Sequence, residues 1–318
     1  MVVARKQFVY ALFELETTNT IYGWSINAGT GALTTLPTFP VGMTLNLPLV
    51  NYNQFNVTTD PGGNFLFISD SGMNEIMVFA IDSSTGTLTA VPGSPFATTI
   101  EPGNIATDGL GKYLYVCLDG SHTGAVIEGF TIGSNGALTA MSSTFTYPIW
   151  QLQGEASGKY MIGTSGNVQF LTGADDPNLY VFSINSTTGA LTQVTKQPTT
   201  YSPFTIAAQP PSSTGEFVYS FSINDTDTGY NPIEGFQLDT NTGALTELTT
   251  SPFQNIFEGQ WGQFDQTGAN LLVYSNVASG SGTLTQLGPL SVDSSGNLTQ
   301  PIGPATLVTS GYWVVTDP

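Results

Sequence analysis

The sequence is poor in charged residues, and positive charge is the scarcest. Only 9% of the 318 residues are charged, and five Lys and Arg stand against 23 Asp and Glu, for a formal net charge of −18. Phosphate recognition depends on cationic side chains, so nucleic acid, an anionic membrane surface and phosphorylated small molecules are not expected as partners. The polar surface must be built mainly from Thr, Ser, Asn and Gln.

Cysteine and histidine each occur once. Cys117 alone cannot form an intrachain disulfide, and His122 alone cannot supply a site that needs two imidazoles. Cys117 falls in the apolar run "YLYVCL", which indicates a buried, inert thiol. His122 lies in "DGSHTG", a pattern typical of an exposed hairpin tip.

Long hydrophobic runs are also missing. No run approaches the roughly 20 apolar residues of a membrane-spanning helix, so no membrane insertion is expected. The first residues, "MVVARKQFVY", pass directly into a strand pattern, and no signal peptide is present in the chain as given. Because the Lys-poor, Thr/Asn/Gly-rich surface resembles that of exported bacterial proteins, we expect an extracellular or periplasmic protein whose leader is absent from this sequence.

What the chain does contain is one short turn in six versions. The copies are "NAGTGALTTL" from Asn27, "DSSTGTLTAV" from Asp82, "GSNGALTAM" from Gly133, "NSTTGALTQV" from Asn185, "DTNTGALTEL" from Asp239 and "DSSGNLTQP" from Asp293. Such self-similarity is the signature of a repeat architecture. Asp or Asn can bond its own backbone in a turn, and Gly supplies a positive φ, so each copy predicts a β-hairpin.

Two strand-like segments precede the "GALT" strand in every repeat. The first is β-branched and aromatic: "FVYALFE", "FLFISD", "YLYVCL", "YMIGTS", "FVYSFS" and "LLVYSN". The second alternates large with small or polar residues: "IYGWSIN", "IMVFAID", "IEGFTIG", "LYVFSIN", "IEGFQLD" and "LGPLSVD". No convincing apolar run at helical spacing occurs, so an all-β fold is expected.

A fourth segment lies between repeats and ends in an acidic or polar residue. It reads "FNVTTD", "GNIATD", "WQLQGE", "FTIAAQ" and "QWGQFD", and the sixth copy, "YWVVTD", ends the chain with no repeat after it. Nothing before Phe8 matches it, so we predict that residues 311–317 pair with the first three strands. The expected fold is one six-bladed β-propeller over residues 1–318, with four antiparallel strands per blade; an open solenoid leaves the last segment unexplained.

The pattern "GKYLYV" followed by "F-x-I-D-x-x-T-G-x-L-T" resembles the lactonase, or 6-phosphogluconolactonase-like, β-propeller family. The resemblance covers nearly the whole chain, through Phe65–Val91, Tyr113–Ala140, Leu179–Val194 and Phe217–Leu248. It implies a propeller with a ligand site at the central channel and, in active members, lactone hydrolysis or a related cyclisation. The family is typically seven-bladed, whereas six repeats are counted here.

The resemblance also implies a histidine, an arginine and a glutamate at the active site. In this sequence the starts of the inner strands carry no histidine, and the only arginine, Arg5, lies near the N-terminus. The anion-binding part of the family's chemistry is therefore missing. Hydrolysis of a phosphorylated lactone is not expected.

The entries of the inner strands are rich in aromatic and amide side chains. Aromatic rings stack on the apolar faces of sugars, and amides bond hydroxyl groups, so these positions suit a neutral small molecule, a glycan or a protein partner. Packing between neighbouring blades is the alternative role for the bulky residues. The predicted ligand-binding residues are Phe55, Asn56, Asn104, Trp150, Gln151, Phe204, Trp261, Tyr312 and Trp313.

Two acidic features are candidates for chemistry. Glu101 and Glu258 share one repeat position and form the candidate catalytic acid/base pair, although the two repeats are nearly opposite in a six-bladed ring and solvated loop carboxylates are the simpler interpretation. The carboxylates after each inner strand, Asp60, Asp108, Glu155, Asp265 and Asp317, are expected to be turn residues.

The loop "NDTDTGYN" offers Asp225 and Asp227 as calcium ligands, but it lacks the distal glutamate of a complete calcium loop. No cofactor is required by any other pattern. Two functional hypotheses follow: an exported propeller that binds a ligand or partner through its channel rim, or a divergent hydrolase of neutral lactones that uses Glu101 or Glu258. The sequence leaves open whether the protein is an enzyme.

Overall fold

The protein is all-β. In a computed structural model the described residues are 2–5, 8–15, 18–26, 33–38, 41–43, 57–118, 126–147, 149–165, 177–210, 216–222, 232–253, 261–264, 268–279, 282–300 and 306–308. They contain 27 strands and no helix, so none of them belongs to a helix that could cross a membrane. The chain divides into two compact units, with the boundary between Tyr147 and Pro148.

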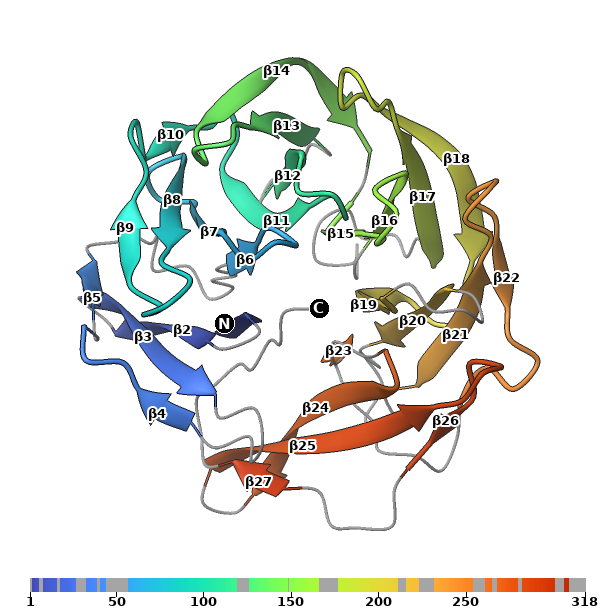
Figure 1. Cartoon of the computed structure of the whole chain (residues 1–318). Helices are drawn as coiled ribbons and strands as arrows, with labels where there is room; N and C mark the ends of the chain where they lie inside the picture. Colours follow the sequence, from blue (N-terminus) through green and yellow to red (C-terminus); the bar gives the residue numbers. More distant parts are fainter. Residues whose placement is uncertain are drawn as a thin grey trace. The chain divides into compact units, whose positions relative to one another are not determined.

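The first unit contains three antiparallel sheets (Figure 1). The first sheet has the order β1 (Val2–Arg5), β2 (Phe8–Leu15), β3 (Thr18–Ile26) and β4 (Leu33–Thr35), with β5 (Val41–Met43) also on β3. The second has β6 (Val57–Thr59), β7 (Phe65–Asp70) and β8 (Glu75–Ile81), with β9 (Leu88–Ala90) and β10 (Phe96–Ala97) both on β8. The third is β11 (Pro102–Thr107), β12 (Tyr113–Leu118), β13 (Val126–Ile132) and β14 (Leu138–Thr146).

The second unit repeats this arrangement (Figure 1). Its first sheet is β15 (Gln151–Gly154), β16 (Tyr160–Thr164), β17 (Asn178–Ile184) and β18 (Leu191–Pro198). Its second is β19 (Pro203–Ala208), β20 (Glu216–Ser222), β21 (Ile233–Leu238) and β22 (Leu245–Glu247). Its third is β23 (Trp261–Phe264), β24 (Asn270–Ser279), β25 (Gly282–Val292) and β26 (Leu298–Thr299), with β27 (Thr306–Val308) on β25.

The repeated segments of the sequence therefore become strands in the predicted order. In the second to sixth sheets the segment that ends in an acidic or polar residue pairs with the aromatic segment, and in all six sheets the aromatic segment pairs with the alternating segment. Within each unit the first strands of successive sheets are neighbours, because β6 contacts β1 and β11, and β19 contacts β15 and β23. We call these first strands the inner strands.

The fourth strand is continuous in some sheets and broken in others. β14 and β18 run for nine and eight residues, whereas the outer strand of the second sheet is split into β9 and β10. Pro92 and Pro95 lie in that break, and proline cannot donate to a strand ladder. The sheets that carry five strands thus keep the predicted four-strand pattern, with the outer strand in two pieces.

The first sheet departs from the prediction at its inner edge. β1 pairs with β2 from Val2↔Ala11 to Arg5↔Phe8, in the place that the other sheets give to their inner strands. The expectation that nothing before Phe8 could fill this place is wrong, because β1 fills it. β1 was overlooked because only two residues separate it from β2, without the longer turn pattern that follows the other inner strands. Residues 311–317, which were predicted to fill it, lie outside the described residues.

The hairpin turns that recur in the sequence have the predicted geometry. Asp82 Oδ1 accepts the backbone N–H groups of Ser84 and Thr85 at 2.9 and 2.8 Å, and Asp239 Oδ1 accepts Asn241 N–H at 2.8 Å. The following glycines have positive φ, as at Gly86 (71°) and Gly243 (75°).

These turns also lock neighbouring sheets together. A Cβ on Gly86 would lie 2.6 Å from the Phe8 ring in the preceding sheet, and a Cβ on Gly243 would lie 2.8 Å from the Tyr160 ring. Tyr10 Oη donates to Gly86 O at 2.7 Å, and Tyr219 Oη donates to Gly296 O at 2.8 Å. The turn therefore recurs because it closes a hairpin and because its glycine lets an aromatic ring of the previous sheet approach.

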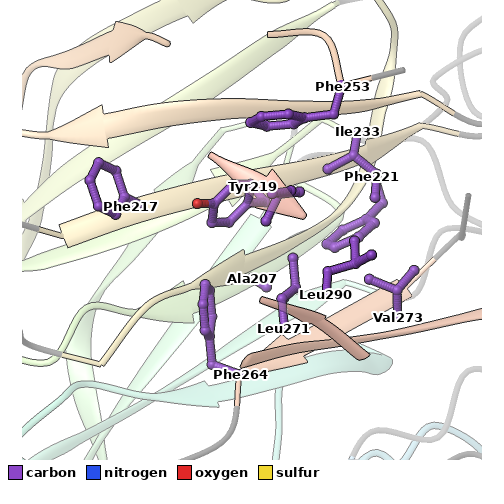
Figure 2. Packing of buried hydrophobic residues seen from close by; sticks show 11 residues of the cluster. Ala207, Phe217, Tyr219, Phe221, Ile233, Phe253, Phe264, Leu271, Val273 and Leu290 are labelled. Atoms are coloured by element: carbon purple, nitrogen blue, oxygen red, sulfur yellow. The ribbon is translucent and has the colours of Figure 1, made fainter. Parts of the chain in front are cut away.

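Hydrophobic cores lie between adjacent sheets. Figure 2 shows one of them in the second unit, where Tyr219 and Phe221 of β20 face Leu271 and Val273 of β24 and Phe264 of β23. Tyr219 lies 5.7 Å from Phe264 and 6.0 Å from Phe253, measured between ring centroids. The period-two alternation of the strands predicts this burial, since residues two apart share one sheet face.

Candidate functional site

Three of the predicted ligand-binding rings meet in the second unit. Trp150 directly precedes β15, Phe204 is the second residue of β19, and Trp261 begins β23. The ring centroids of Trp150 and Phe204 are 5.7 Å apart at an interplanar angle of 37°, and those of Phe204 and Trp261 are 5.9 Å apart at 73°. We call Trp150, Phe204 and Trp261 the aromatic row.

The aromatic row is only partly buried. All three residues keep some solvent exposure, whereas their neighbours Leu152 and Ile206 on the same inner strands are buried. The rings therefore pack across neighbouring sheets, as the packing interpretation predicts, and also retain exposed surface, as a ligand platform requires.

The position of Trp261 differs by one residue from the sequence alignment, which placed it level with Gln151. Leu152 pairs with Gly163, the fourth residue of "YMIGTS", and Trp261 pairs with Tyr274, the fourth residue of "LLVYSN". Trp261 is thus level with Leu152. The alignment matched the terminal acidic residues of the two segments, but in the structure Phe264 holds the place of Glu155.

Gln151, which follows Trp150, bonds to the strand that carries Phe204. Its Oε1 accepts Ile206 N–H at 2.9 Å, and Gln153 Oε1 accepts Ala208 N–H at 3.0 Å, so both side chains tie β15 to the neighbouring inner strand. Because the bonds of Gln151 use its carbonyl oxygen, its Nε2 group has no acceptor among the described residues. A hydrogen-bond donor therefore follows Trp150 in the sequence, on a side chain that bonds to β19, the strand of Phe204.

A buried glutamate that the sequence analysis missed holds the loop that leads to Phe204. Glu234 on β21 is fully buried, and its Oε1 and Oε2 accept the N–H groups of Thr200 and Tyr201 at 2.8 and 3.2 Å. Burial raises the pKa of Glu234; the two N–H groups act in the opposite direction, and nearby Glu247 raises it further. The signal was present in "IEGFQLD" and "IEGFTIG", which have glutamate where the other repeats have Tyr, Met or Gly.

In the first unit a buried glutamate also holds the loop before an inner strand, but no aromatic row is present among the described residues. Glu128 of "IEGFTIG" is buried on β13, and its Oε2 accepts Thr99 N–H at 2.9 Å in the loop before β11. The predicted ligand residue Asn104 is buried on β11, and Glu101 is partly exposed in that loop. Glu258 lies outside the described residues, so its pairing with Glu101 stays a prediction.

Several other predicted site residues lie outside the described part of the chain. They are Phe55, Asn56, Tyr312, Trp313, Asp225 and Asp227. Among the described residues no group of three or more His, Cys, Asp or Glu side chains could hold a metal ion. The calcium site at Asp225 and Asp227 also stays a prediction.

The carboxylates after the inner strands are turn residues, as predicted. Asp108 Oδ1 accepts Lys112 and Tyr113 N–H at 2.7 and 2.6 Å, and Asp60 Oδ1 accepts Asn64 and Phe65 N–H at 2.6 Å each. Asp265 and Asp317 lie outside the described residues.

Cys117 is buried on β12, as predicted, and burial raises the pKa of its thiol, so it stays protonated and inert. His122 lies outside the described residues.

The sheet order and the packing of neighbouring inner strands are those of a β-propeller. Residues 1–150 match the family model described as "Lactonase, 7-bladed beta-propeller". Together with the solved structures below, this match supports the resemblance that the repeat motif predicts: the first 150 residues are similar to the lactonase family, and the chain has a β-propeller fold.

Solved structures support the same fold. A protein from Lactobacillus plantarum and a candidate 6-phosphogluconolactonase from Bacteroides fragilis are each 16% identical, with TM-scores of 0.64 and 0.63, over 94% of this chain and 82% of theirs. A periplasmic gluconolactonase from Pseudomonas aeruginosa is 13% identical, with a TM-score of 0.54 over 96% of both chains. No curated protein matches the sequence. At these identities the likeness shows the fold alone.

Proposed function

We propose that this lactonase-like propeller binds a neutral, polyhydroxylated ring, such as a glycan unit or an uncharged sugar lactone, on the aromatic row. The observation that carries the proposal is the contact of three partly exposed rings from three successive inner strands. Such rings offer an apolar platform for the C–H face of a sugar, and Gln151 Nε2 offers a donor for a hydroxyl group.

Charge supports a neutral ligand. The chain has five Lys and Arg in 318 residues. The loop before Phe204, residues 199–202, contains no charged side chain, and its one ionisable group is the phenol of Tyr201. A phosphorylated or carboxylated sugar would meet net repulsion from a protein of charge −18. A 6-phosphogluconolactonase activity is therefore not proposed.

Hydrolysis of neutral lactones is the second candidate function. It is favoured by the lactonase family match over residues 1–150, which include Glu101, a partly exposed carboxylate at the entry of an inner strand. Glu101 would act as the general base toward water, with Glu258 as its predicted partner.

The same experiment separates the two functions. Purified protein is titrated with cellotriose, maltotriose and glucono-1,5-lactone by calorimetry, and lactone opening is followed by acid release. We expect Trp150→Ala and Trp261→Ala to weaken binding at least about tenfold, the equivalent of about 1.4 kcal/mol. Trp24→Ala is the control, because Trp24 stacks on Tyr22 at 6.1 Å in the first unit.

Two results would contradict the binding proposal: unchanged affinity in both row variants, or no binding of any of the three probes to the wild type. Lactone turnover that is lost in Glu101→Gln or Glu258→Gln would favour the hydrolase instead. Repeating the assay with a chelator tests whether a metal ion contributes, as the calcium prediction at Asp225 and Asp227 requires.

At the level of the fold, the proposal is one propeller of six blades over residues 1–318. It is supported by six four-stranded patterns that follow six sequence repeats. Two segments compete for the inner edge of β2: β1, which pairs there, and residues 311–317, which the sequence pattern predicts. We assign the edge to β1.

A further inference from the structure

We propose that Glu234 is a positioning residue that holds the loop Thr199–Ser202 so that Phe204 stands between Trp150 and Trp261. The consequence for ligand binding rests on the function proposed above, whereas the effect on the rings themselves does not.

The loop is fixed at several points, and Glu234 supplies two of them from a fully buried carboxylate. Thr199 N–H donates to Pro177 O at 2.8 Å, and Thr199 Oγ1 donates to Tyr201 O at 2.7 Å. In addition, the N–H groups of Thr200 and Tyr201 each donate a hydrogen bond to the Glu234 carboxylate. Without it, two part-buried donors would lose a charged acceptor, and a hydrogen bond to a charged group typically contributes about 1.5–3 kcal/mol.

The chain passes directly from this loop to the aromatic row. Pro203 follows Ser202 and restricts the backbone, and Phe204 comes next. From the other side, Phe204 O accepts Thr164 Oγ1–H of β16 at 3.1 Å. A change in the loop therefore moves Phe204 at its N-terminal side while its carbonyl stays attached to the neighbouring sheet.

The two-oxygen geometry requires a carboxylate. Oε1 and Oε2 each serve one N–H from adjacent residues. A glutamine has a single carbonyl oxygen, and its NH2 group would face the second N–H as donor against donor. Glu234→Gln is therefore nearly isosteric but leaves one loop donor unpaired.

The first unit provides a matched control. Glu128 is buried at the same strand position, accepts Thr99 N–H, and holds a loop in which Thr98 Oγ1 donates to Ile100 O at 2.6 Å and Thr98 N–H donates to Asn74 O at 2.8 Å. The residue that corresponds to Phe204 there is Gly103, so this loop leads to no aromatic ring. Glu128→Gln disturbs an equivalent loop without touching the aromatic row.

Protonation of Glu234 in the wild type should weaken the attachment of the loop, as Glu234→Gln does. The groups that face Glu234 are Glu247 of β22, Tyr201 of the loop and Ser220, which lies directly opposite on β20. Protonation leaves one carbonyl oxygen for two N–H donors, so it favours release of the loop. Because burial raises the pKa of Glu234, this release should occur at milder acidity than for an exposed glutamate.

The test compares Glu234→Gln with Glu128→Gln without and with a probe. Near-ultraviolet circular dichroism reports how Trp150, Phe204 and Trp261 couple, and calorimetry reports the affinity for cellotriose. We expect Glu234→Gln to change the aromatic spectrum, to weaken cellotriose binding about 3- to 10-fold and to lack the acid transition of the wild type. Glu128→Gln should leave all three unchanged.

A wild-type spectrum and acid profile in Glu234→Gln, or an equal change in both variants, would overturn the proposal. If the wild type binds no cellotriose, the proposed function fails, but the spectra still decide the role of Glu234. Should Glu234→Gln fail to fold, amide hydrogen exchange of the wild type as a function of pH tests the proposal instead. After correction for intrinsic rates, Thr200 and Tyr201 must then lose protection in acid before global unfolding, and retained protection would refute the proposal.

Discussion

At the scale of single residues, buried carboxylates hold several of the turns that join the strands. Glu155 follows β15 and accepts four hydrogen bonds, from Ser157 N–H, Ser157 Oγ–H, Lys159 N–H and Tyr160 N–H, at 2.6–3.0 Å. Its neighbour Glu216, at the start of β20, is only 3% exposed, and its Oε1 has no partner among the described residues. One carboxyl of this pair must keep its proton at neutral pH.

That proton belongs to Glu216. Burial, the charge of Glu155 and the hydrogen bond to Glu155 together raise the pKa of Glu216 to about 8, although Ala156 N–H acts in the opposite direction. The other charged group on the same turn, Lys159, donates to Thr240 O instead, at 3.3 Å. The two neighbouring carboxyl groups therefore carry a single negative charge between them.

The pair predicts a pH-dependent stability. The folded pKa of Glu216 lies above its unfolded value, so its contribution is full below about pH 4.5 and is lost as the pH rises toward about 8. The loss is on the order of 5 kcal/mol, because the shift is about 3.5 pKa units. Glu216→Gln should remove this dependence and stabilise the protein at pH 8, as urea unfolding from pH 5 to 8.5 would measure. Parallel pH profiles of variant and wild type would contradict it.

The sequence could predict which residues stand at the site, but not which of them meet. Trp150, Phe204 and Trp261 were identified from their places at strand entries. That their rings touch depends on the packing of three sheets and on a one-residue shift of β23, which no local pattern reveals. Glu234 was missed because a glutamate in a strand is usually solvated, whereas here loop N–H groups compensate its burial.

At the scale of elements, the repeated turn explains both the strands and their packing. Strand type and order followed from alternation and turn residues, because those properties are local. The contact of the turn glycine with the preceding sheet could not be predicted, since it joins residues about 80 positions apart, such as Gly243 and Tyr160. The inner strand β1 was missed because its connection to β2 lacks the polar turn of the other repeats.

The packing role of the turn glycine can be separated from its backbone role. Gly243 and Gly93 both have positive φ, 75° and 92°, so alanine at either site carries a backbone cost of about 1–2 kcal/mol. Only at Gly243 would the new Cβ also lie 2.8 Å from the Tyr160 ring and 2.9 Å from Val194; at Gly93 the nearest atom, in Phe96, is 3.3 Å away. Gly243→Ala should therefore cost a further 1–3 kcal/mol or so.

Chemical unfolding of the two variants measures this difference. Equal destabilisation by Gly243→Ala and Gly93→Ala would show that the glycine serves the hairpin alone and that the turn does not lock the sheets.

At the scale of the whole molecule, the described residues form six sheets in two compact units, and the inner strands carry side chains from successive repeats. Self-similarity predicted this number of sheets, because each repeat must bury its faces against the next. Which segment completes the first sheet was not predictable, since two segments of the sequence suit one edge; β1 pairs there, and residues 311–317 lie outside the described residues.

Deletion of each chain end tests that assignment. Because β1 completes the first sheet, removal of residues 1–6 should expose the edge of β2 and lower the melting temperature by at least about 4 °C. Removal of residues 311–318 should have the smaller effect. The opposite ranking would show that the C-terminal segment closes the fold.

The most direct test of the central claim is a crystal structure of the protein with cellotriose or glucono-1,5-lactone. The account predicts a sugar ring stacked on the row of Trp150, Phe204 and Trp261, within hydrogen-bond reach of Gln151 Nε2. A probe bound elsewhere with these three rings uncovered, or a row left empty at saturating probe concentration, would contradict it.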